Sequence, residues 1–193
     1  MKLTVNEALL LLEQARIKSN DERFINHSIC VGNTAGIIAE SLQLDVDYAK
    51  TLGYLHDIGK QTGISKQHPI NGYHYIKSLG YGDEYAAICL THSYLNNDVF
   101  CTAGGVPKED PFVVNYIKEH EYTIYEKIVN LCDLMCTDKV MTIDKRLVDL
   151  IIRKGAHENT QYHIKETYKL KAYLDEQVGY NIYKLFPEII ENL

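Results

Sequence analysis

The sequence lacks a long apolar segment. Near the N-terminus it has only the short apolar run of residues 8–12, between Glu7 and Glu13. That run is too short for a secretion signal or for a membrane-spanning helix, which needs about 20 apolar residues. We therefore expect a cytoplasmic protein with no membrane partner.

The sequence also lacks a cysteine framework and an excess of positive charge. Five cysteines stand at irregular positions, without the C-x-x-C spacing of zinc sites, so we expect reduced and mostly buried thiols. The formal net charge is −6, which does not favour a nucleic-acid polymer as partner. Residues 139–171 differ, with eight Lys and Arg against four Asp and Glu, and this basic segment can meet an anionic ligand.

No convincing period-two pattern of a β-strand occurs, and the sequence predicts an all-α fold. Capping residues and helical periodicity predict helices over residues 4–17, 22–42 and 123–136. They also predict helices that begin at about residues 45, 69, 83, 111, 142 and 160. Gly32 and Gly36 predict a close approach by another helix. Residues 93–110 lack periodicity, which indicates an Ω-type functional loop, such as a substrate lid, or a mobile segment.

The length of 193 residues and the hydrophobic content of 46% allow one domain with a sizeable core. We expect a single domain over residues 1–193, in which residues 22–136 carry the motifs and the helices of residues 137–193 pack on them.

Histidines recur on the apolar faces of the predicted helices. His27, His56 and His92 each share a face with aliphatic residues, and His68 precedes Pro69 as an expected helix cap. Unpaired buried imidazoles and carboxylates cost several kcal/mol each, a cost that a cation removes. Six candidate ligands from five elements follow: His27, His56, Asp57, His68, His92 and Asp133.

Imidazole and carboxylate ligands together suit Fe, Mn, Co, Zn or Ni rather than Ca. Six ligands are enough for two metal ions, with Asp57 as the bridge between them. Two ions about 3.5–4 Å apart activate water and neutralise a phosphoryl group, so hydrolysis of phosphoester or phosphoanhydride bonds fits best. A mononuclear centre is the alternative, because His68 can be only a helix cap and His92 only a core residue.

His27, the pair His56-Asp57 and Asp133 resemble the H…HD…D signature of the HD-domain metal-dependent phosphohydrolases. Periodicity aligns Asp133 with the polar residues Glu126 and Asn130, and only this resemblance places it inward. More narrowly, five segments resemble the bacterial HD hydrolases that split diadenosine tetraphosphate symmetrically: residues 23–27, 55–60, 68–72, 91–93 and 127–133.

This resemblance covers about residues 22–136. It implies a helical bundle around a dinuclear, iron-type centre held by the six residues above. In it, His27, His56 and Asp133 complete one metal sphere, and His68 and His92 serve the other. Two features depart from related enzymes. Ser93 stands where HD cyclic-dinucleotide phosphodiesterases have a second histidine, and residues 93–123 form a longer segment than expected between the blocks of His92 and Asp133.

Phosphate contacts are expected outside the ligand set. Lys60, Arg23, Arg146 and Arg153 are the candidates, and Arg146 and Arg153 share a helical face. An ordinary solvated face explains most of the basic segment better than phosphate binding does, and a solvated lysine explains Lys60 equally well. Arg23 can pair instead with a ligand carboxylate. The remaining histidines match no block and are expected at the surface: His74, His120, His157 and His163.

The sequence therefore predicts a metal-dependent phosphohydrolase that acts on a small nucleotide or a related phosphate compound, such as a dinucleoside polyphosphate. We expect Asp57, His56 and Lys60 to carry catalysis, with Fe as the first metal and Mn, Co, Ni or Zn as alternatives. Two other functions are consistent with the residues. One is a non-catalytic module that binds a nucleotide or a protein partner, and the other is a di-iron oxygenase.

Overall fold

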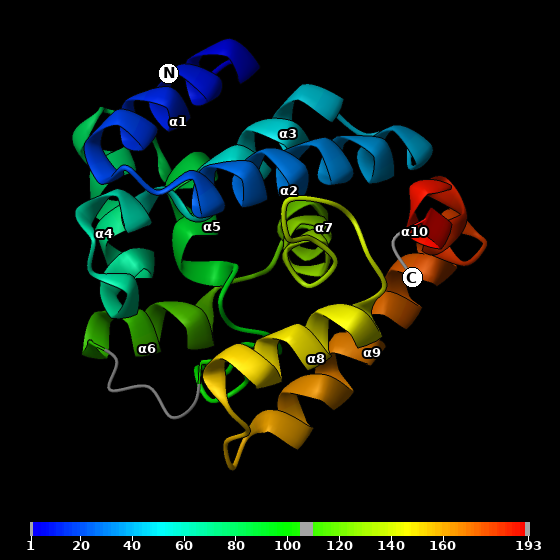
Figure 1. Cartoon of the computed structure of the whole chain (residues 1–193). Helices are drawn as coiled ribbons and strands as arrows, with labels where there is room; N and C mark the ends of the chain where they lie inside the picture. The colour runs from blue at the N-terminus through cyan, green and yellow to red at the C-terminus, as the bar shows by residue number, and fades with distance from the viewer. Residues whose placement is uncertain (1, 105–109, 192–193) are drawn as a thin grey trace.

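The computed structural model describes residues 2–104 and 110–191, and within these ranges it contains helices and no strand (Figure 1). The all-α prediction is confirmed. The elements are α1 (Val5–Ser19), α2 (Glu22–Ser41), α3 (Val46–Leu55), the 3₁₀ helices η1 (Ile58–Thr62) and η2 (Ser65–Gln67), α4 (His68–Ser78), α5 (Asp83–Thr91), α6 (Pro111–Glu119), α7 (Ile124–Asp133), α8 (Ile143–Lys154), α9 (Thr160–Val178), the 3₁₀ helix η3 (Ile182–Leu185) and α10 (Glu188–Glu191).

Local capping explains where most helices begin. Thr4 and Thr123 each form the predicted capping box with the glutamate three residues later, and the Asp45 side chain accepts from the backbone of Tyr48. Two predicted boundaries are wrong. α7 ends at Asp133 and does not continue to residue 136, and α4 begins at His68 itself, whose side chain is not a cap.

α2 and α3 cross at two glycines. A Cβ atom on Gly53 would lie 2.5 Å from the Cα of Gly32, and one on Gly32 would lie 2.3 Å from the Tyr54 ring. Only glycine allows this approach, and the predicted role of Gly32 is confirmed. His27 precedes Gly32 on α2 and His56 follows Gly53 at the end of α3, so the close crossing holds the two rings side by side.

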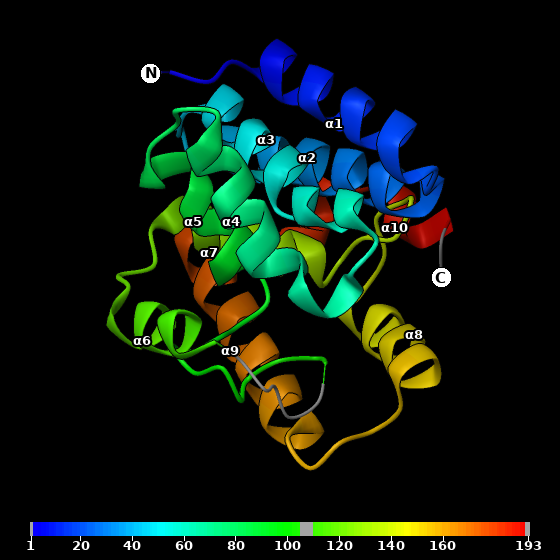
Figure 2. The same ribbon diagram turned by 90° about the vertical axis from the view of Figure 1, so that its left-hand side faces the viewer.

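α7 lies at the centre of the fold, with α2 and α3 on one side and α9 on the other (Figure 1). Its buried residues Ile128, Val129, Leu131 and Cys132 are fully inaccessible to solvent. α1 covers the far side of α2 and α3 (Figure 2). A helix buried on nearly all sides offers a fixed support for whatever its last residue, Asp133, contacts.

The segment after α5 has no regular helix over residues 93–104, while residues 105–109 of the predicted 93–110 loop lie outside the described residues. Tyr94 and Val99 from this segment pack with Val113 and Ile117 of α6 in a small apolar cluster. Within the described ranges, no helix has both the length and the apolar character needed to cross a bilayer.

Candidate metal centre

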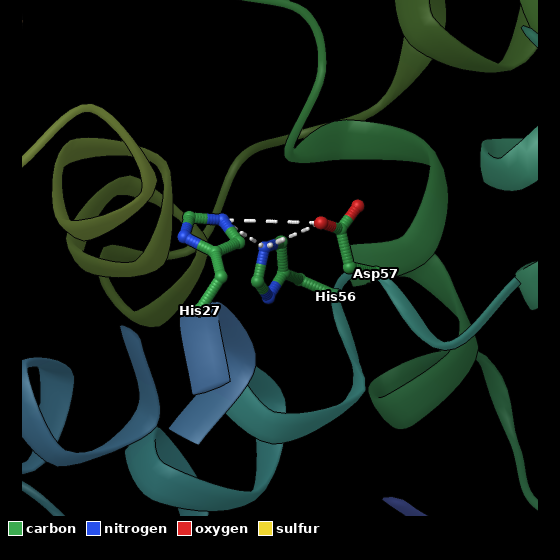
Figure 3. Close-up of side chains that lie close together, drawn as sticks. All are labelled: His27, His56 and Asp57. Atoms are coloured by element: carbon green, nitrogen blue, oxygen red, sulfur yellow. Dashed lines mark hydrogen bonds and ion pairs between the residues drawn. The ribbon is translucent and has the colours of Figure 1, made fainter. Parts of the chain in front are cut away.

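Three side chains converge where α2 meets the end of α3 (Figure 3). The Nε2 atoms of His27 and His56 are 3.3 Å apart, and they lie 3.8 and 3.5 Å from Oδ2 of Asp57. His56 is fully buried and Asp57 is 2% exposed. Such a group of ring nitrogens and one carboxylate oxygen has the size and chemistry of a transition-metal site.

The other oxygen of Asp57 faces a second group. Nε2 of His68 and of His92 lie 3.2 and 3.4 Å from Oδ1 of Asp57, and they are 3.1 Å from each other. His68 comes from the first turn of α4 and His92 from the end of α5. Asp57 therefore stands between two pairs of histidines, with one oxygen toward each pair.

Backbone carbonyl groups fix the orientation of three of these rings. Nδ1 of His56 lies 2.6 Å from the Gly53 oxygen, Nδ1 of His92 lies 3.0 Å from the Ile88 oxygen, and Nδ1 of His27 lies 3.3 Å from the Thr137 oxygen. A carbonyl only accepts, so each Nδ1 carries a hydrogen, and in the neutral form of such a ring the lone pair is at Nε2. Metal-binding histidines are oriented in the same way.

The protonation states also suit a metal ion. Burial lowers the pKa of His56 to about 3, which keeps its ring neutral. Burial alone would raise the pKa of Asp57, but the Lys60 ammonium group and the surrounding histidines together outweigh burial, and the pKa lies well below its ordinary value. Metal ions need neutral imidazoles and ionised carboxylates. Lone pairs that face one another around a buried carboxylate fit a divalent transition-metal ion, which would attract all of them.

Asp133 joins the first group from the end of α7. Its Oδ1 lies 2.9 Å from Nε2 of His27 and 4.0 Å from Nε2 of His56. Burial raises its pKa, yet the hydrogen bond and charge of His27, together with the charge of His56, outweigh burial and hold the pKa well below the ordinary value. The six residues proposed from the sequence thus lie around one point, with Asp133 at the solvent side of the first group.

Of the four residues expected to contact phosphate, two are paired with acidic residues of the site. Nζ of Lys60 donates to Oδ2 of Asp57. Arg146 is 6% exposed, and its Nε donates to the backbone oxygen of Asp133 over 3.4 Å while its Nη1 contacts Asp149 at 2.6 Å. Lys60 and Arg146 therefore each contact a candidate ligand directly, Asp57 through its side chain and Asp133 through its backbone.

The centre forms the floor of a cleft of about 740 Å³ between the helical core and the C-terminal helices. Arg23 and Arg153 are exposed residues of its wall, and Arg153 makes a two-point contact with Asp149 at 3.0 and 2.7 Å. Leu95, Thr102 and Ala103 of the segment after α5 also line the cleft.

Two of the four histidines expected at the surface are not exposed. His74 and His157 are exposed as predicted, but His163 is only 5% exposed and lines the cleft. His120 is half-buried and pairs with the buried Glu126 at 2.8 Å. The buried face of α9 consists of His163, Thr167, Lys171 and Leu174. Three of these four residues are polar, so helical spacing gave no apolar stripe that marked this face as inward.

The sequence matches the model of the HD domain over residues 24–138, which is more than half of the chain. This chain belongs to the HD domain family. The HD match begins at the first turn of α2 and ends just after α7, so it contains all six candidate ligands. α8 and α9, which form one side of the cleft, lie outside it.

Curated relatives of this HD domain include several proteins named Ribonuclease Y. The one from Symbiobacterium thermophilum is 38% identical over 175 residues, which are 90% of this chain and 27% of the relative. The one from Fervidobacterium nodosum is 33% identical over 89 residues, which are 45% of this chain and 17% of the relative. The chain thus spans only about a sixth to a quarter of the length of these relatives.

Among solved structures, the HD domain of the L. monocytogenes phosphodiesterase PgpH in complex with cyclic-di-AMP is similar to this chain. The identity is 19%, the match covers 86% of this chain and 96% of that one, and the TM-score is 0.49.

Proposed function

We propose that this protein is a metal-dependent phosphohydrolase. The observation that carries the proposal is the position of Asp57, which presents one oxygen to His27 and His56 and the other to His68 and His92. A carboxylate shared in this way suits a pair of metal ions, and membership of the HD domain family supports the assignment. Asp133 completes the first sphere. We propose Fe as the first metal and Mn, Co, Ni or Zn as substitutes.

Bound ions would supply an activated water molecule and positive charge for a phosphoryl group. The residues of the chain would do the rest. Lys60 would exchange its contact with Asp57 for a substrate phosphate, as a flexible point charge can. Arg23 and Arg153 line the cleft from the exposed side, where they would bind outer phosphates, while Arg146 holds Asp133 and Asp149.

We propose a small nucleotide as the substrate. A cleft of about 740 Å³ lies within the range of small-ligand sites, roughly 300–1,000 Å³. The five motif segments favour a dinucleoside polyphosphate within this class. The names of the curated relatives support a second candidate, the hydrolysis of RNA, against which the net charge of −6 counts.

A panel of substrates tests the proposal. Protein loaded anaerobically with Fe(II), and separately with Mn, Co, Ni and Zn, should hydrolyse at least one of a dinucleoside polyphosphate, a cyclic dinucleotide, a short RNA and bis(p-nitrophenyl) phosphate. Turnover without O₂ excludes an oxygenase. A full metal complement with nucleotide binding and no hydrolysis of any substrate would contradict the proposal in favour of a binding module.

The Asp57→Asn variant tests whether metal binding and activity depend on Asp57. The amide cannot bridge two cations, so we expect activity to fall at least about a hundredfold and bound metal to fall to one ion or none per chain. Metal analysis and steady-state kinetics measure the two effects. Asp47→Asn, an exposed position on α3, is the matched control. Retention of both metal and activity in Asp57→Asn would refute the role of Asp57.

A further inference from the structure

His163 is a buried imidazole that the proposed reaction does not use. It lies in the first turns of α9, is 5% exposed and lines the same cleft as the metal centre. Its backbone groups bond to Asn159 and Thr167, but its ring forms no hydrogen bond to any part of the chain that the structure describes. It also stands outside both groups of candidate metal ligands.

The His163 ring can bond to a molecule in the cleft. It lines the cleft, and no group of the described chain bonds to its nitrogens, so a ligand there can use them. Burial also lowers the pKa of His163 to about 4, so the ring is neutral at pH 7 and offers one donor and one acceptor. A neutral group of this kind is suited to another neutral polar group rather than to a phosphate.

The walls of the cleft combine charged and apolar side chains. Arg153 and Lys154 of α8 supply positive charge there, as Lys60 does at the floor. The apolar lining residues are Leu150 of α8 and Leu95 and Ala103 after α5. Tyr162, the neighbour of His163, accepts a hydrogen bond from Asn96 at 2.9 Å, which ties α9 to the segment after α5. Apolar side chains beside a neutral hydrogen-bonding group suit a nucleoside, and the positive charges of the cleft suit its phosphate.

We propose that His163, together with Leu95 and Leu150, forms a nucleoside subsite whose ring hydrogen-bonds the base or the ribose of a nucleotide with its phosphate at the metal centre. The inference rests on the proposed phosphohydrolase function and its nucleotide substrate, and it adds the side chains that contact the nucleoside. It also assigns substrate selection to α8, α9 and the segment after α5. α8 and α9 lie outside the HD match.

The binding affinities of three ligands of increasing size test the subsite without turnover. Calorimetry on the Mn-loaded protein compares inorganic phosphate, ribose 5-phosphate and AMP. For the wild type we expect AMP to bind at least about tenfold more tightly than phosphate. In His163→Ala, AMP binding should weaken by about fivefold to tenfold, the range of one hydrogen bond, while phosphate binding stays within twofold. An equal loss for ribose 5-phosphate assigns the contact to the ribose, and no loss for it assigns the contact to the base.

Two further variants complete the design. His163→Gln keeps a donor and an acceptor and should recover part of the AMP affinity, and His157→Ala changes an exposed histidine just before α9 and should change nothing. Unchanged phosphate binding shows that each variant is folded. AMP affinity that His163→Ala leaves unchanged, or a loss equal for phosphate and AMP, would overturn the subsite.

The failure of the subsite differs from the failure of the proposed function. The function is tested by the turnover of bis(p-nitrophenyl) phosphate, which contains no nucleoside, and the subsite is tested by binding alone. With a nucleotide substrate, His163→Ala should raise KM and leave kcat within about twofold, because the ring contacts the nucleoside and not the reacting phosphorus. A loss of kcat on bis(p-nitrophenyl) phosphate in this variant would contradict that assignment.

Discussion

Lys60 donates to the same oxygen of Asp57 that faces His27 and His56. Asp57 is almost fully buried, so its charge needs a partner, and in the metal-free chain Lys60 provides it. A metal ion at the same oxygen would take over this task. One lysine would therefore stabilise the metal-free protein and become available to a substrate phosphate once metal is bound.

This exchange predicts that the loss of stability in Lys60→Met depends on whether metal is bound. Without metal, the free energy of unfolding should fall by about 2 kcal/mol, because a buried carboxylate loses the ammonium group that donates a hydrogen bond to it. With Mn in excess, the loss should shrink to less than about 0.5 kcal/mol. Urea unfolding with EDTA and with Mn measures both values.

Lys66→Met, at an exposed lysine of η2, serves as the control and should have no effect in either condition. Equal destabilisation of Lys60→Met with and without metal would show that the ion does not replace Lys60.

At the scale of elements, η1 packs on α4 with almost no space between them. A Cβ atom on Gly59 would lie 2.0 Å from the backbone oxygen of His68 and 2.5 Å from the nitrogen of Gly72. Backbone atoms cannot turn aside as a side chain can, so one of the two elements would have to move. This contact fixes the start of α4, and with it the position of His68 beside Asp57.

Gly59→Ala should therefore lower the free energy of unfolding by about 2 kcal/mol or more and displace His68 from the second ligand group. Urea unfolding and metal analysis measure the two effects, and we expect at most one ion per chain. Gly80→Ala is the control, because Gly80 has a φ of +86° and open space around it. It should cost about 1 kcal/mol through backbone strain alone and leave the metal content unchanged.

α6 and α7 are joined at an ion pair between His120 and the buried Glu126. The hydrogen bond and charge of Glu126 raise the pKa of His120 above 6.5. Burial acts against ionisation of Glu126, but its bonds with His120 and Thr123 lower its pKa. The stabilisation from His120 is complete below its unfolded pKa and is lost as pH rises through the raised folded pKa. The stabilisation from Glu126 is complete above about pH 4.5 and is lost as pH falls through its lowered folded pKa.

His120→Gln should thus cost about 1.5 kcal/mol at pH 5.5 and clearly less at pH 8.5. Urea unfolding of the wild type and the variant at both values gives the difference, from which the titration of other histidines cancels. His157→Gln, at an exposed histidine, should show no such pH dependence. A cost for His120→Gln that is constant across this range would mean that the pair contributes no charge interaction.

At the scale of the whole molecule, the six candidate ligands are spread over more than half of the chain. His27 and Asp133 are 106 residues apart in sequence yet 2.9 Å apart in space. An ion at the centre would tie α2, the α3–η1 junction, α4, α5 and α7 together. Since the unfolded chain has no such site, binding should stabilise the entire fold.

We expect Mn at a hundred times its dissociation constant to raise the free energy of unfolding by about 2.7 kcal/mol, and EDTA to reverse this. Thermal or urea unfolding across a metal titration measures the effect. Asp57→Asn should lose most of the stabilisation. Equal stability with and without metal in the wild type would indicate that no ion binds at the centre.

Local signals in the sequence determined much of this fold. Thr4, Asp45 and Thr123 marked helix starts because a capping side chain reaches only two or three residues along the chain. The same short range explains why His27, His56 and His92 could be assigned to inward faces from their helical spacing. Asp133 needed the family resemblance, since its own helix places it on a polar edge.

Other features were decided only by tertiary structure. Periodicity told which residues share a face of α9, but not that the face of His163 lies on the cleft and is covered. Likewise the sequence offered Arg146 as a phosphate contact, and packing buried it against Asp133. Helical spacing acts over three or four residues, whereas burial and partners depend on segments that meet only after folding. The sequence by itself therefore determined the helices and the set of candidate ligands, and the tertiary structure decided their partners and the walls of the cleft.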